Sequence, residues 1–349
     1  MIEQMPSLIE IFRCATWQPA APVQRPFVRY LHPEASPGEY ICLQPCSQTI
    51  RVSVLIPTMD ADRGGLFEKL LRQIDLQTLN GFEVIVIKGD PRQGRAINIG
   101  ASLAKGDFLL TLDDDSSLPD KRAFANLFAV LENDPAIGLA GGINTIPPDA
   151  PWLVRRAMRE IPRRSTPPLS DITDSDLAEH PLLVMRRDVF ERVGGENELL
   201  PRGLDPYLRQ EFRKAGCRVV VVPNVFYSHL PPATLQRLLR QFYRNGKHAA
   251  YVYRYFPQWS IATPSQHGSF PPRHRIRHRA LRLLANLLEA LITLKFIWFL
   301  CQLSYSAGVL KETLTLQRSI ESRLRLNTGK AHNIPNGKAF TRERRHGEE

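Results

Sequence analysis

The sequence lacks the features that mark several classes of protein. Its cysteines are too few and too scattered for a disulfide framework, which excludes a small secreted fold held by disulfides. Cys42 and Cys46 have no second pair of cysteines or histidines near them, so no zinc site is predicted. The first residues contain no basic segment followed by an apolar core. No secretory signal is therefore predicted, and we expect a cytoplasmic protein.

Long apolar runs and acidic charge are also scarce. The uncharged run 296–310 falls short of the ~20 residues that a membrane-spanning helix needs. The net charge is +11, and the chain from Pro271 onward has 15 Lys and Arg against 6 Asp and Glu. A basic chain favours an anionic partner, such as a phosphate group or an anionic lipid. No aromatic side chains alternate with the cations of the basic stretch 273–282, so no nucleic-acid partner is predicted.

What is present indicates a globular α/β protein. The 349 residues, 43% hydrophobic and 23% charged, suffice for a large core. Strand-like and helix-like segments alternate along the chain in the order 51–57, 66–77, 82–90, 93–103, 107–115, 123–133 and 137–143. This alternation predicts a doubly wound, mostly parallel sheet, in which functional groups gather at the carboxyl ends of the strands.

Composition divides the chain into further parts. Residues 1–50 contain several prolines and are predicted to form a coil-rich N-terminal extension. Residues 145–181, rich in Pro, Arg and Ser, are predicted to form a long surface excursion. We expect the α/β domain to span 51–235, a helical region to span 236–326, and a disordered tail to span 327–349.

The strongest chemical signal is the triplet Asp113, Asp114 and Asp115 after the third predicted strand. Alternating side chains would point Asp113 and Asp115 one way and Asp114 the other. Two carboxylates so placed suit a hard divalent cation, which in turn screens a bound diphosphate. The alternative is an acidic turn that caps the following helix.

Several segments resemble one enzyme family. VSVLIPT, FEVIVI and GRAINIGASLAKGDFLLTLDDD, followed by MRRDVFERVGG and LPRGLDPYLRQEFRKAGCRVVVVPNVFYSHL, resemble family 2 glycosyltransferases with the GT-A fold, from about Arg51 to about Tyr255. The resemblance implies a GT-A-like catalytic domain over 51–235 and a C-terminal helical extension. It also implies a nucleotide-diphosphate sugar donor and Mg²⁺ or Mn²⁺ as cofactor. Asp113 and Asp115 match the DxD motif of the family, whose acids hold the metal and the ribose or diphosphate.

The resemblance assigns further residues to the donor. The contacts to the nucleotide that it implies come from Pro57, Thr58 and Asp60, and the segment packed beneath the sugar-nucleotide contains Arg95, Asn98 and Gly100. The family usually ends its second strand with a pair of acids, whereas this chain has Lys88 there. An ammonium group cannot accept a hydrogen bond from a base, so Asp90 is the substitute candidate and the base stays open.

Two residues of the second half complete the site that the resemblance implies. Asp205 matches the catalytic acid that would remove the proton of the acceptor hydroxyl, although Leu204 stands where the family has a neighbouring acid. The alternative is that Asp205 only caps the helix beginning at Pro206. His229, after the predicted strand 217–223, matches a histidine that contacts metal or diphosphate, and the alternative is a structural histidine.

The C-terminal region suggests a partner surface. Basic residues precede an apolar helix that contains Trp298, a pattern that fits a helix lying on the anionic cytoplasmic face of a membrane. The alternatives are a helix packed on the catalytic domain, a homodimer seam, and a true membrane span.

The sequence therefore predicts a metal-dependent, inverting glycosyltransferase that moves a sugar to a hydroxyl of a saccharide or of a lipid-linked glycan. One alternative is a nucleotidyltransferase, but IPTMDADRGG lacks the fuller glycine-rich loop expected after the first strand of that class. The other is a non-catalytic sugar-nucleotide-binding protein, which Lys88 and Leu204 suggest.

Overall fold

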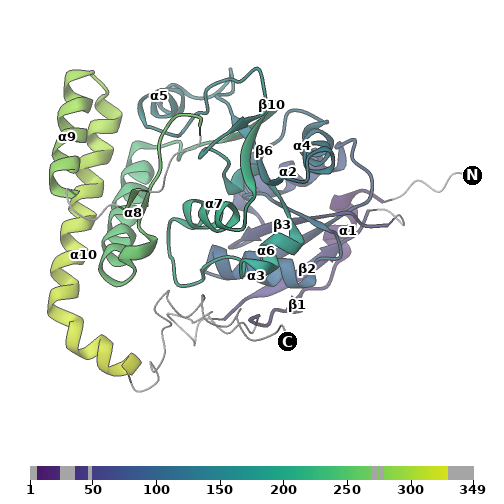
Figure 1. Cartoon of the computed structure of the whole chain (residues 1–349), viewed down its shortest axis with the longest axis horizontal. Coiled ribbons are helices and arrows are strands. Elements are labelled where there is room, and N and C mark those ends of the chain that lie inside the picture. The colour runs from purple at the N-terminus through teal and green to yellow at the C-terminus, as the bar shows by residue number, and fades with distance from the viewer. Residues whose placement is uncertain (1–5, 24–35, 46–48, 269–272, 275–278, 329–349) are drawn as a thin grey trace, which may run out of the picture.

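The computed structural model describes residues 6–23, 36–45, 49–268, 273–274 and 279–328 of the chain. A central sheet lies between helices, and a separate layer of long helices covers one side of this α/β unit (Figure 1). From residue 329 onward, the predicted tail lies outside the described residues. Residues 275–278 of the basic stretch also lie outside them.

The central sheet follows the order β1-β2-β4-β3-β5-β9-β7-β10-β6, with β8 paired to β10. The strands are β1 (Gln18–Pro19), β2 (Glu39–Leu43), β3 (Val52–Thr58), β4 (Phe82–Lys88), β5 (Phe108–Thr111), β6 (Ser116–Ser117), β7 (Ile137–Asn144), β8 (Thr173–Asp174), β9 (Leu183–Arg186) and β10 (Arg218–His229). β4, β3, β5, β7 and β10 all run in one direction, and β9 runs against them between β5 and β7. The predicted mostly parallel sheet is confirmed.

Both faces of the sheet are buried because its strands are apolar on both sides. In β3, Val54 and Ile56 pack on one face and Leu55 on the other, and all three are fully buried. The first face is covered by α1 (Leu8–Cys14), α2 (Leu66–Asp75) and α4 (Ala123–Asn133), and the second by α3 (Gln93–Leu103), α6 (Arg187–Arg192) and α7 (Leu204–Lys214). The doubly wound α/β class is therefore confirmed.

The prediction of a coil-rich extension over residues 1–50 is wrong for part of that segment. β2 pairs antiparallel with β4 and extends the sheet. α1 begins at a capping box formed by Ser7 and Glu10, and the backbone N–H of Leu8 donates to the Asp75 carboxylate of α2 at 2.9 Å. The sequence did not predict these elements because prolines dominate the composition of the segment. Each element is also short and pairs with residues distant in the sequence.

The predicted surface excursion over 145–181 also contains ordered, buried structure. α5 (Trp152–Glu160) lies within it, and Val154, Ala157 and Met158 on one face of this helix are buried. Further along, Ser175 is fully buried. The arginines of α5 lowered the apparent hydrophobicity of the segment, although its helical spacing is amphipathic.

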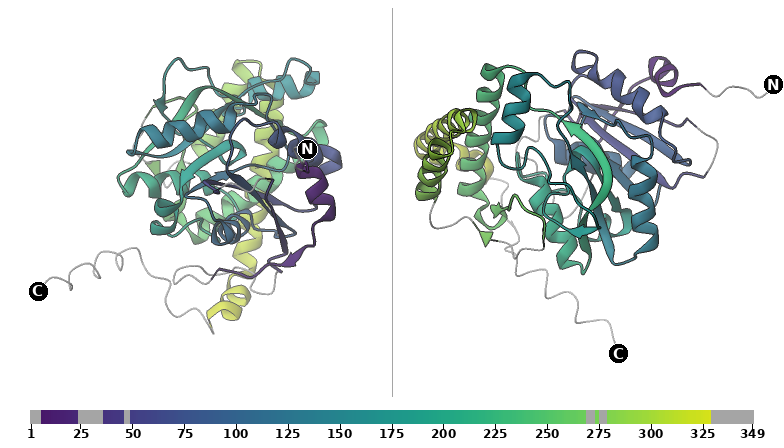
Figure 2. Two further views of the ribbon diagram at one scale, coloured as in Figure 1. Left: turned by 90° about the vertical axis from the view of Figure 1, so that its right-hand side faces the viewer. Right: turned by 90° about the horizontal axis from the view of Figure 1, so that it is seen from above.

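The C-terminal region forms a helical layer from α8 (Leu235–Tyr255), α9 (Arg279–Ile292) and α10 (Phe296–Thr328). α10 packs along α8, on the side of α8 away from the sheet (Figure 2). The two helices cross closely at Gly246 and Gly308, where an added Cβ would collide with the Tyr305 and Tyr243 carbonyl oxygens, respectively. None of the described helices combines the length and the apolar character required to cross a bilayer. A short hairpin of β11 (Ile261–Ala262) and β12 (Arg273–His274) lies apart from the main sheet.

Trp298 does not have the interfacial position that the sequence suggested. Its side chain is 3% exposed and packs with Ile161, Leu238 and Cys301 between α5, α8 and α10. The start of α10 is fixed by Glu160, whose Oε2 accepts from the backbone N–H groups of Ile297 and Trp298 at 2.7 and 3.2 Å. The beginning of α10 is thus packed on the catalytic domain, as one of the alternatives predicted.

The close crossing of α8 and α10 predicts that replacing a glycine at the crossing lowers the stability of the protein. In an isolated helix, Gly308→Ala would add ~1 kcal/mol of stability through helix propensity. Here the new methyl group would meet the Tyr243 backbone, so we expect Gly308→Ala to lower the free energy of unfolding by about 1–3 kcal/mol. Urea unfolding measures this change. Thr313→Ala, at an exposed position of the same helix, is the control and should not destabilise. A stabilised Gly308→Ala variant would contradict the crossing.

Candidate active site

The acidic triplet 113–115 lies on the loop between β5 and β6. β6 pairs antiparallel with the end of β10, and Ser116 lies opposite His229 in this pairing. Because paired strands are only about 4.8 Å apart, the pairing carries the His229 ring to the acids. Residues separated by more than 110 positions in the sequence are thereby brought into one site.

β10 is longer than the predicted strand 217–223. It continues to His229 through a register shift between Val221 and Phe226, where Asn224 has a positive φ of 58°. Asparagine is among the residues that tolerate this conformation best. His229 is therefore the last residue of a strand and does not lie in a loop after it.

The three acids point in two directions, as the alternation predicted. The Asp114 carboxylate accepts from Thr58 Oγ1 at 2.7 Å and from Arg63 Nε at 2.8 Å. Arg63 Nη2 also donates to Asp115 Oδ2 at 3.0 Å. The Asp114 carboxylate is thus engaged in contacts with Thr58 and Arg63. Asp113 and Asp115 lie on the side of His229.

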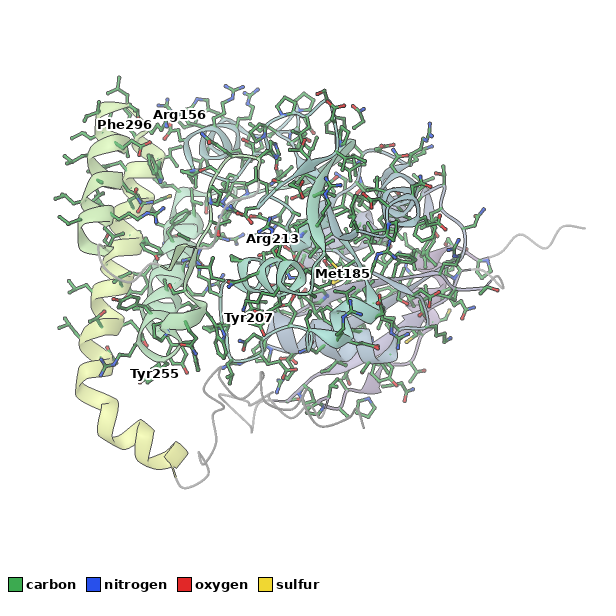
Figure 3. The ribbon with its side chains drawn as sticks, viewed as in Figure 1. Arg156, Met185, Tyr207, Arg213, Tyr255 and Phe296 are labelled. Carbon is green, nitrogen blue, oxygen red and sulfur yellow. The ribbon has the colours of Figure 1, made fainter. Side chains whose placement is uncertain are left out.

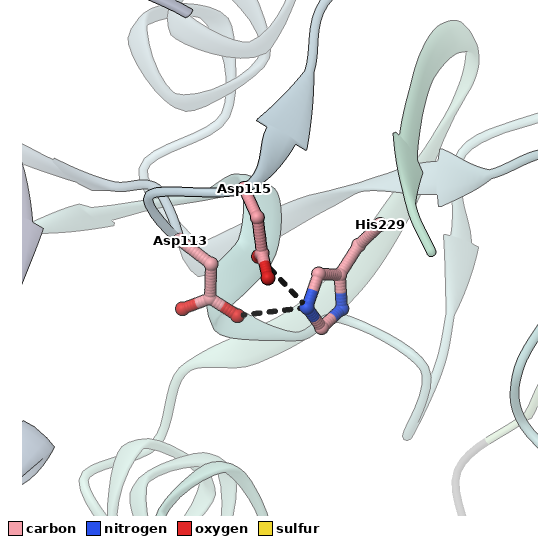
Figure 4. A group of neighbouring side chains, drawn as sticks. All are labelled: Asp113, Asp115 and His229. Carbon is pink, nitrogen blue, oxygen red and sulfur yellow. Dashed lines mark ion pairs between the residues drawn. The ribbon is translucent and has the colours of Figure 1, made fainter. Parts of the chain in front are cut away.

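Asp113, Asp115 and His229 form a group that can hold a metal ion (Figure 4). His229 Nε2 lies 3.2 Å from Asp115 Oδ1 and 3.7 Å from Asp113 Oδ2, and one ligand atom from each residue lies within 4.8 Å of the others. Ligand atoms around an octahedral Mg²⁺ lie about 3 Å apart at adjacent positions. Asp115 Oδ1 is buried and has no hydrogen bond of normal geometry among the described residues. Two carboxylates and one imidazole fit Mn²⁺ or Mg²⁺.

The charges of this group are mutually dependent. Burial raises the pKa of Asp113 to about 6, although His229 acts in the opposite direction. Burial disfavours protonated His229, but its contact with Asp115 and the charge of Asp113 outweigh that effect and raise the pKa of His229. For Asp115, the burial effect is outweighed by His229 and Arg63, so its pKa is lowered. A cation bound between the acids would replace the proton of His229.

Asp205 lies in the first turn of α7, and its side chain is 29% exposed. Gly203, with a φ of 85°, occupies the N-cap position, so Asp205 is not the cap residue. Asp205 Oδ1 accepts from the backbone N–H of His180 at 2.8 Å, and no described residue donates to Oδ2. Burial raises the pKa of Asp205, but the His180 and Arg209 cations outweigh it and lower the pKa, which keeps this carboxylate ionised at neutral pH.

His180 joins the two acidic parts of the site. Its Nε2 forms an ion pair with Glu196 Oε1 at 2.9 Å and lies 4.0 Å from Asp205 Oδ1. Its Nδ1 lies 3.1 Å from the hydroxyl of Thr111, the last residue of β5. Burial lowers the pKa of His180, but Asp205 and Glu196 raise it more strongly, to about 9 overall. A buried imidazolium therefore lies beside Asp205, and its charge also acts on Asp113 of the candidate metal group.

The structure separates the predicted donor-side residues into two groups. Pro57 and Thr58 end β3 beside Asp114, and Asp60 Oδ1 accepts from the backbone N–H groups of Asp62 and Arg63 in the loop that positions Arg63. These residues border the acidic triplet.

The remaining predicted donor-side residues, Asp90, Arg95 and Asn98, are engaged in hydrogen bonds within the protein. Both Asp90 oxygens are held by Arg95, at 2.6 and 2.8 Å, and Asp90 Oδ1 also accepts from the Arg92 backbone. Asn98 donates to Glu198 Oε1 and to the Glu196 carbonyl, and accepts from the Glu196 N–H. The Asp90 carboxylate therefore forms an ion pair with Arg95 and does not contact the acidic triplet.

Sequence reasoning did not assign Arg63, His180 and Glu196 to the site. Arg63 lies in a short loop without a recognisable motif, and no local pattern links His180 to Asp205. Lys88, which departs from the family pattern, pairs with Glu39 at 3.0 Å and lies 3.9 Å from the centre of the Trp17 ring. The ammonium group therefore holds the N-terminal segment against the sheet.

Comparison with known proteins identifies the enzyme class. Residues 75–194 match the model of the family described as glycosyl transferase family 2. This segment includes Asp113 and Asp115 and ends before Asp205 and His229. The match agrees with the resemblance seen in the sequence: residues 75–194 are similar to family 2 glycosyltransferases, and the chain is accordingly a sugar-transferring enzyme.

Two solved structures have a remote overall similarity. One is the mannosyltransferase PcManGT from Pyrobaculum calidifontis in complex with GDP-Man and Mn²⁺, with a TM-score of 0.47 and 16% identity over 87% of this chain and 92% of that chain. The other is S. aureus TarS, with a TM-score of 0.39 and 14% identity over 58% of this chain and 40% of that chain. No curated protein sequence matches this chain. Similarities this remote identify neither donor nor acceptor.

The raised pKa of His180 predicts how stability depends on pH. The folded-state pKa of about 9 exceeds the ~6.5 of an unfolded histidine, so the stabilisation is complete below pH 6.5 and is lost as the pH rises through 9. We expect the Tm to fall across this window. His180→Gln should lower the Tm at pH 6 and weaken its dependence between pH 6.5 and 9. Thermal unfolding at several pH values measures both effects, and equal slopes for the two proteins would contradict the charged network.

Proposed function

We propose that this chain is a metal-dependent, inverting glycosyltransferase that transfers a sugar from a nucleotide-diphosphate donor to a hydroxyl of a saccharide or of a lipid-linked glycan. The observation that carries this proposal is the group Asp113, Asp115 and His229 together with a separate ionised carboxylate, Asp205, whose charge acts on Asp113. Transfer with inversion needs a metal site for the leaving diphosphate and one base for the acceptor. Among the described residues, this metal group and Asp205 are the candidates for the two roles.

On the donor side, Asp113, Asp115 and His229 would hold a divalent cation. The ion would supply positive charge that stabilises the departing diphosphate, so that no protein acid is required there. Arg63 adds a second positive charge next to Asp115. The Arg63 side chain is 46% exposed, so its guanidinium could contact a phosphate oxygen while it holds the loop.

On the acceptor side, Asp205 would accept the proton of the attacking hydroxyl. His180 fixes Oδ1 through its backbone N–H, which leaves Oδ2 to face the acceptor. A base with a lowered pKa is a weaker proton acceptor, but it is fully ionised before each turnover. The acceptor hydroxyl becomes more acidic as its oxygen attacks the sugar. A base with a lowered pKa would therefore take up the hydroxyl proton during the attack, not before it.

The two alternatives have less support. In a nucleotidyltransferase, a glycine-rich loop after β3 would cradle phosphates, whereas the segment here, IPTMDADRGG, lacks the fuller glycine-rich pattern. A non-catalytic protein would be expected to lose the base, but Asp205 is present. Leu204, beside it, is buried in a cluster with Leu199 and Phe256, which explains the loss of the second acid of the family pattern by packing. We further propose a cytoplasmic location.

Neutralising the metal-binding acids should remove cation binding. Asp113→Asn and Asp115→Asn should each weaken Mn²⁺ binding by at least about 100-fold, because a neutral amide is a poor ligand for a hard cation. The fold should persist because both side chains are close in size to the originals. Calorimetric titration with Mn²⁺ in the presence of a nucleoside diphosphate is the measurement. Asp120→Asn, outside the group, is the control. Unchanged affinity in both variants would refute the metal site.

Replacing the base should separate catalysis from donor binding. Asp205→Asn should lower kcat by about 10²–10⁴-fold and leave donor affinity nearly unchanged. The amide oxygen can still accept from the His180 N–H, so the local fold should be preserved. Asp188→Asn, on the exposed face of α6, is the matched control. Turnover of the Asp205 variant within a few-fold of the unmodified enzyme would mean that another residue is the base.

A further inference from the structure

The turn between α9 and α10 exposes apolar side chains that the fold does not require. Ile292, Leu294 and Phe296 are 78%, 62% and 52% exposed. Leu294 also has a φ of 55°, in the left-handed region that glycine and asparagine adopt at least cost. A leucine that is both exposed and conformationally unfavourable contributes little to folding. Its presence is better explained by contact with something outside the molecule.

An exposed tryptophan extends this surface. Trp152, at the start of α5, is 62% exposed, and the Arg156 guanidinium lies 5.6 Å from the centre of its ring. Arg156 Nη2 also donates to the Leu294 carbonyl at 3.4 Å. One arginine therefore links the tryptophan to the turn, and Figure 3 shows Arg156 and Phe296 at the same end of the helical layer. We call Trp152, Ile292, Leu294 and Phe296 the apolar corner.

Positive charge surrounds the apolar corner. Arg155 and Arg159 are exposed on α5, Arg156 is partly exposed, and Lys295 lies within the turn. The acids in these segments are Asp149 and Glu289, both exposed, and Glu160. Glu160 is buried and already accepts from Arg156 and from the backbone of α10. The corner therefore combines apolar and aromatic tips with an excess of cations.

We propose that the apolar corner binds the surface of an anionic lipid bilayer. Ile292, Leu294 and Phe296 would enter the boundary between headgroups and acyl chains, where tryptophan is also favoured. The arginines and Lys295 would lie at the lipid phosphates. A second copy of this chain is a poorer occupant, because it would bring two basic corners together. This surface differs from the predicted one, since it uses α5 and excludes Trp298.

The inference is independent of the proposed catalytic function, because binding to vesicles needs neither donor nor metal. The probe is a set of sucrose-loaded vesicles of phosphatidylcholine, with or without phosphatidylglycerol, sedimented with the full-length protein. We expect the protein to sediment with the phosphatidylglycerol vesicles, and much less with phosphatidylcholine alone or in high salt. Sedimentation with neither vesicle would overturn the proposal.

The variant that tests the corner is Ile292→Ser, Leu294→Asn and Phe296→Ser combined. Asparagine suits the left-handed position, so folding should not suffer. Loss of three apolar contacts should lower the vesicle partition coefficient by more than about tenfold. The control is Leu310→Ser with Leu314→Ser, two exposed leucines that begin about 21 Å along α10 from Phe296. The control should bind within about twofold of the unmodified protein. Equal losses in both variants, or none in the corner variant, would overturn the proposal.

Two further measurements separate the outcomes if the triple variant misfolds or if copies associate. Trp152 fluorescence should shift to shorter wavelength when anionic vesicles are added, and the shift should disappear in Trp152→Phe. Light scattering without vesicles should give the same mass for the unmodified protein and the triple variant. An absent shift, or a dimer that the triple variant abolishes, would overturn lipid binding, and the dimer would assign the corner to self-association.

Discussion

The antiparallel pairing of β6 with the end of β10 is the contact on which the site depends. Three consecutive carboxylates repel one another, and burial makes the repulsion worse because the interior screens charge poorly. The structure offsets this repulsion with two cations, one hydroxyl and the Gln93 side-chain amide, which donates to Asp113 Oδ1 at 2.9 Å. Arg63 and Thr58 hold Asp114 on one side, and the β6–β10 pairing delivers His229 to Asp113 and Asp115 on the other. The loop retains its acids because each has a specific partner.

A buried histidine connects this donor side to the acceptor side. His180 contacts the end of β5 through Thr111, and it contacts Asp205 through its backbone N–H. The Glu196 carboxylate supplies the negative charge that a buried imidazolium requires. Glu196 is in turn joined to α3 through Asn98. This chain of contacts would hold the proposed metal group and the proposed base, Asp205, in a fixed relation.

Local sequence patterns were sufficient for the α/β class and for the acidic loop. From residue 51 onward, apolar strand-like runs alternate with segments of helical spacing, so each element can be predicted from its own residues. Three adjacent acids are likewise easy to recognise. What could not be predicted depends on distant pairing. β2 joins β4 across more than 40 residues, Asp90 is neutralised by Arg95, and His180 reaches Asp205 only once α7 has packed. The exposure of the α9–α10 turn and the burial of Trp298 likewise follow from which side of α10 meets α8.

The central claim is that one metal ion joins His229 to the diphosphate of the donor. Pulsed electron paramagnetic resonance of the Mn²⁺-loaded enzyme with a bound nucleoside diphosphate tests this directly, because the electron spin of Mn²⁺ couples to nuclei of its ligands. The account predicts ¹⁴N coupling from the His229 imidazole together with ³¹P coupling from the diphosphate, and loss of the ¹⁴N signal alone in His229→Gln. A spectrum with ³¹P coupling but no histidine ¹⁴N coupling would contradict it.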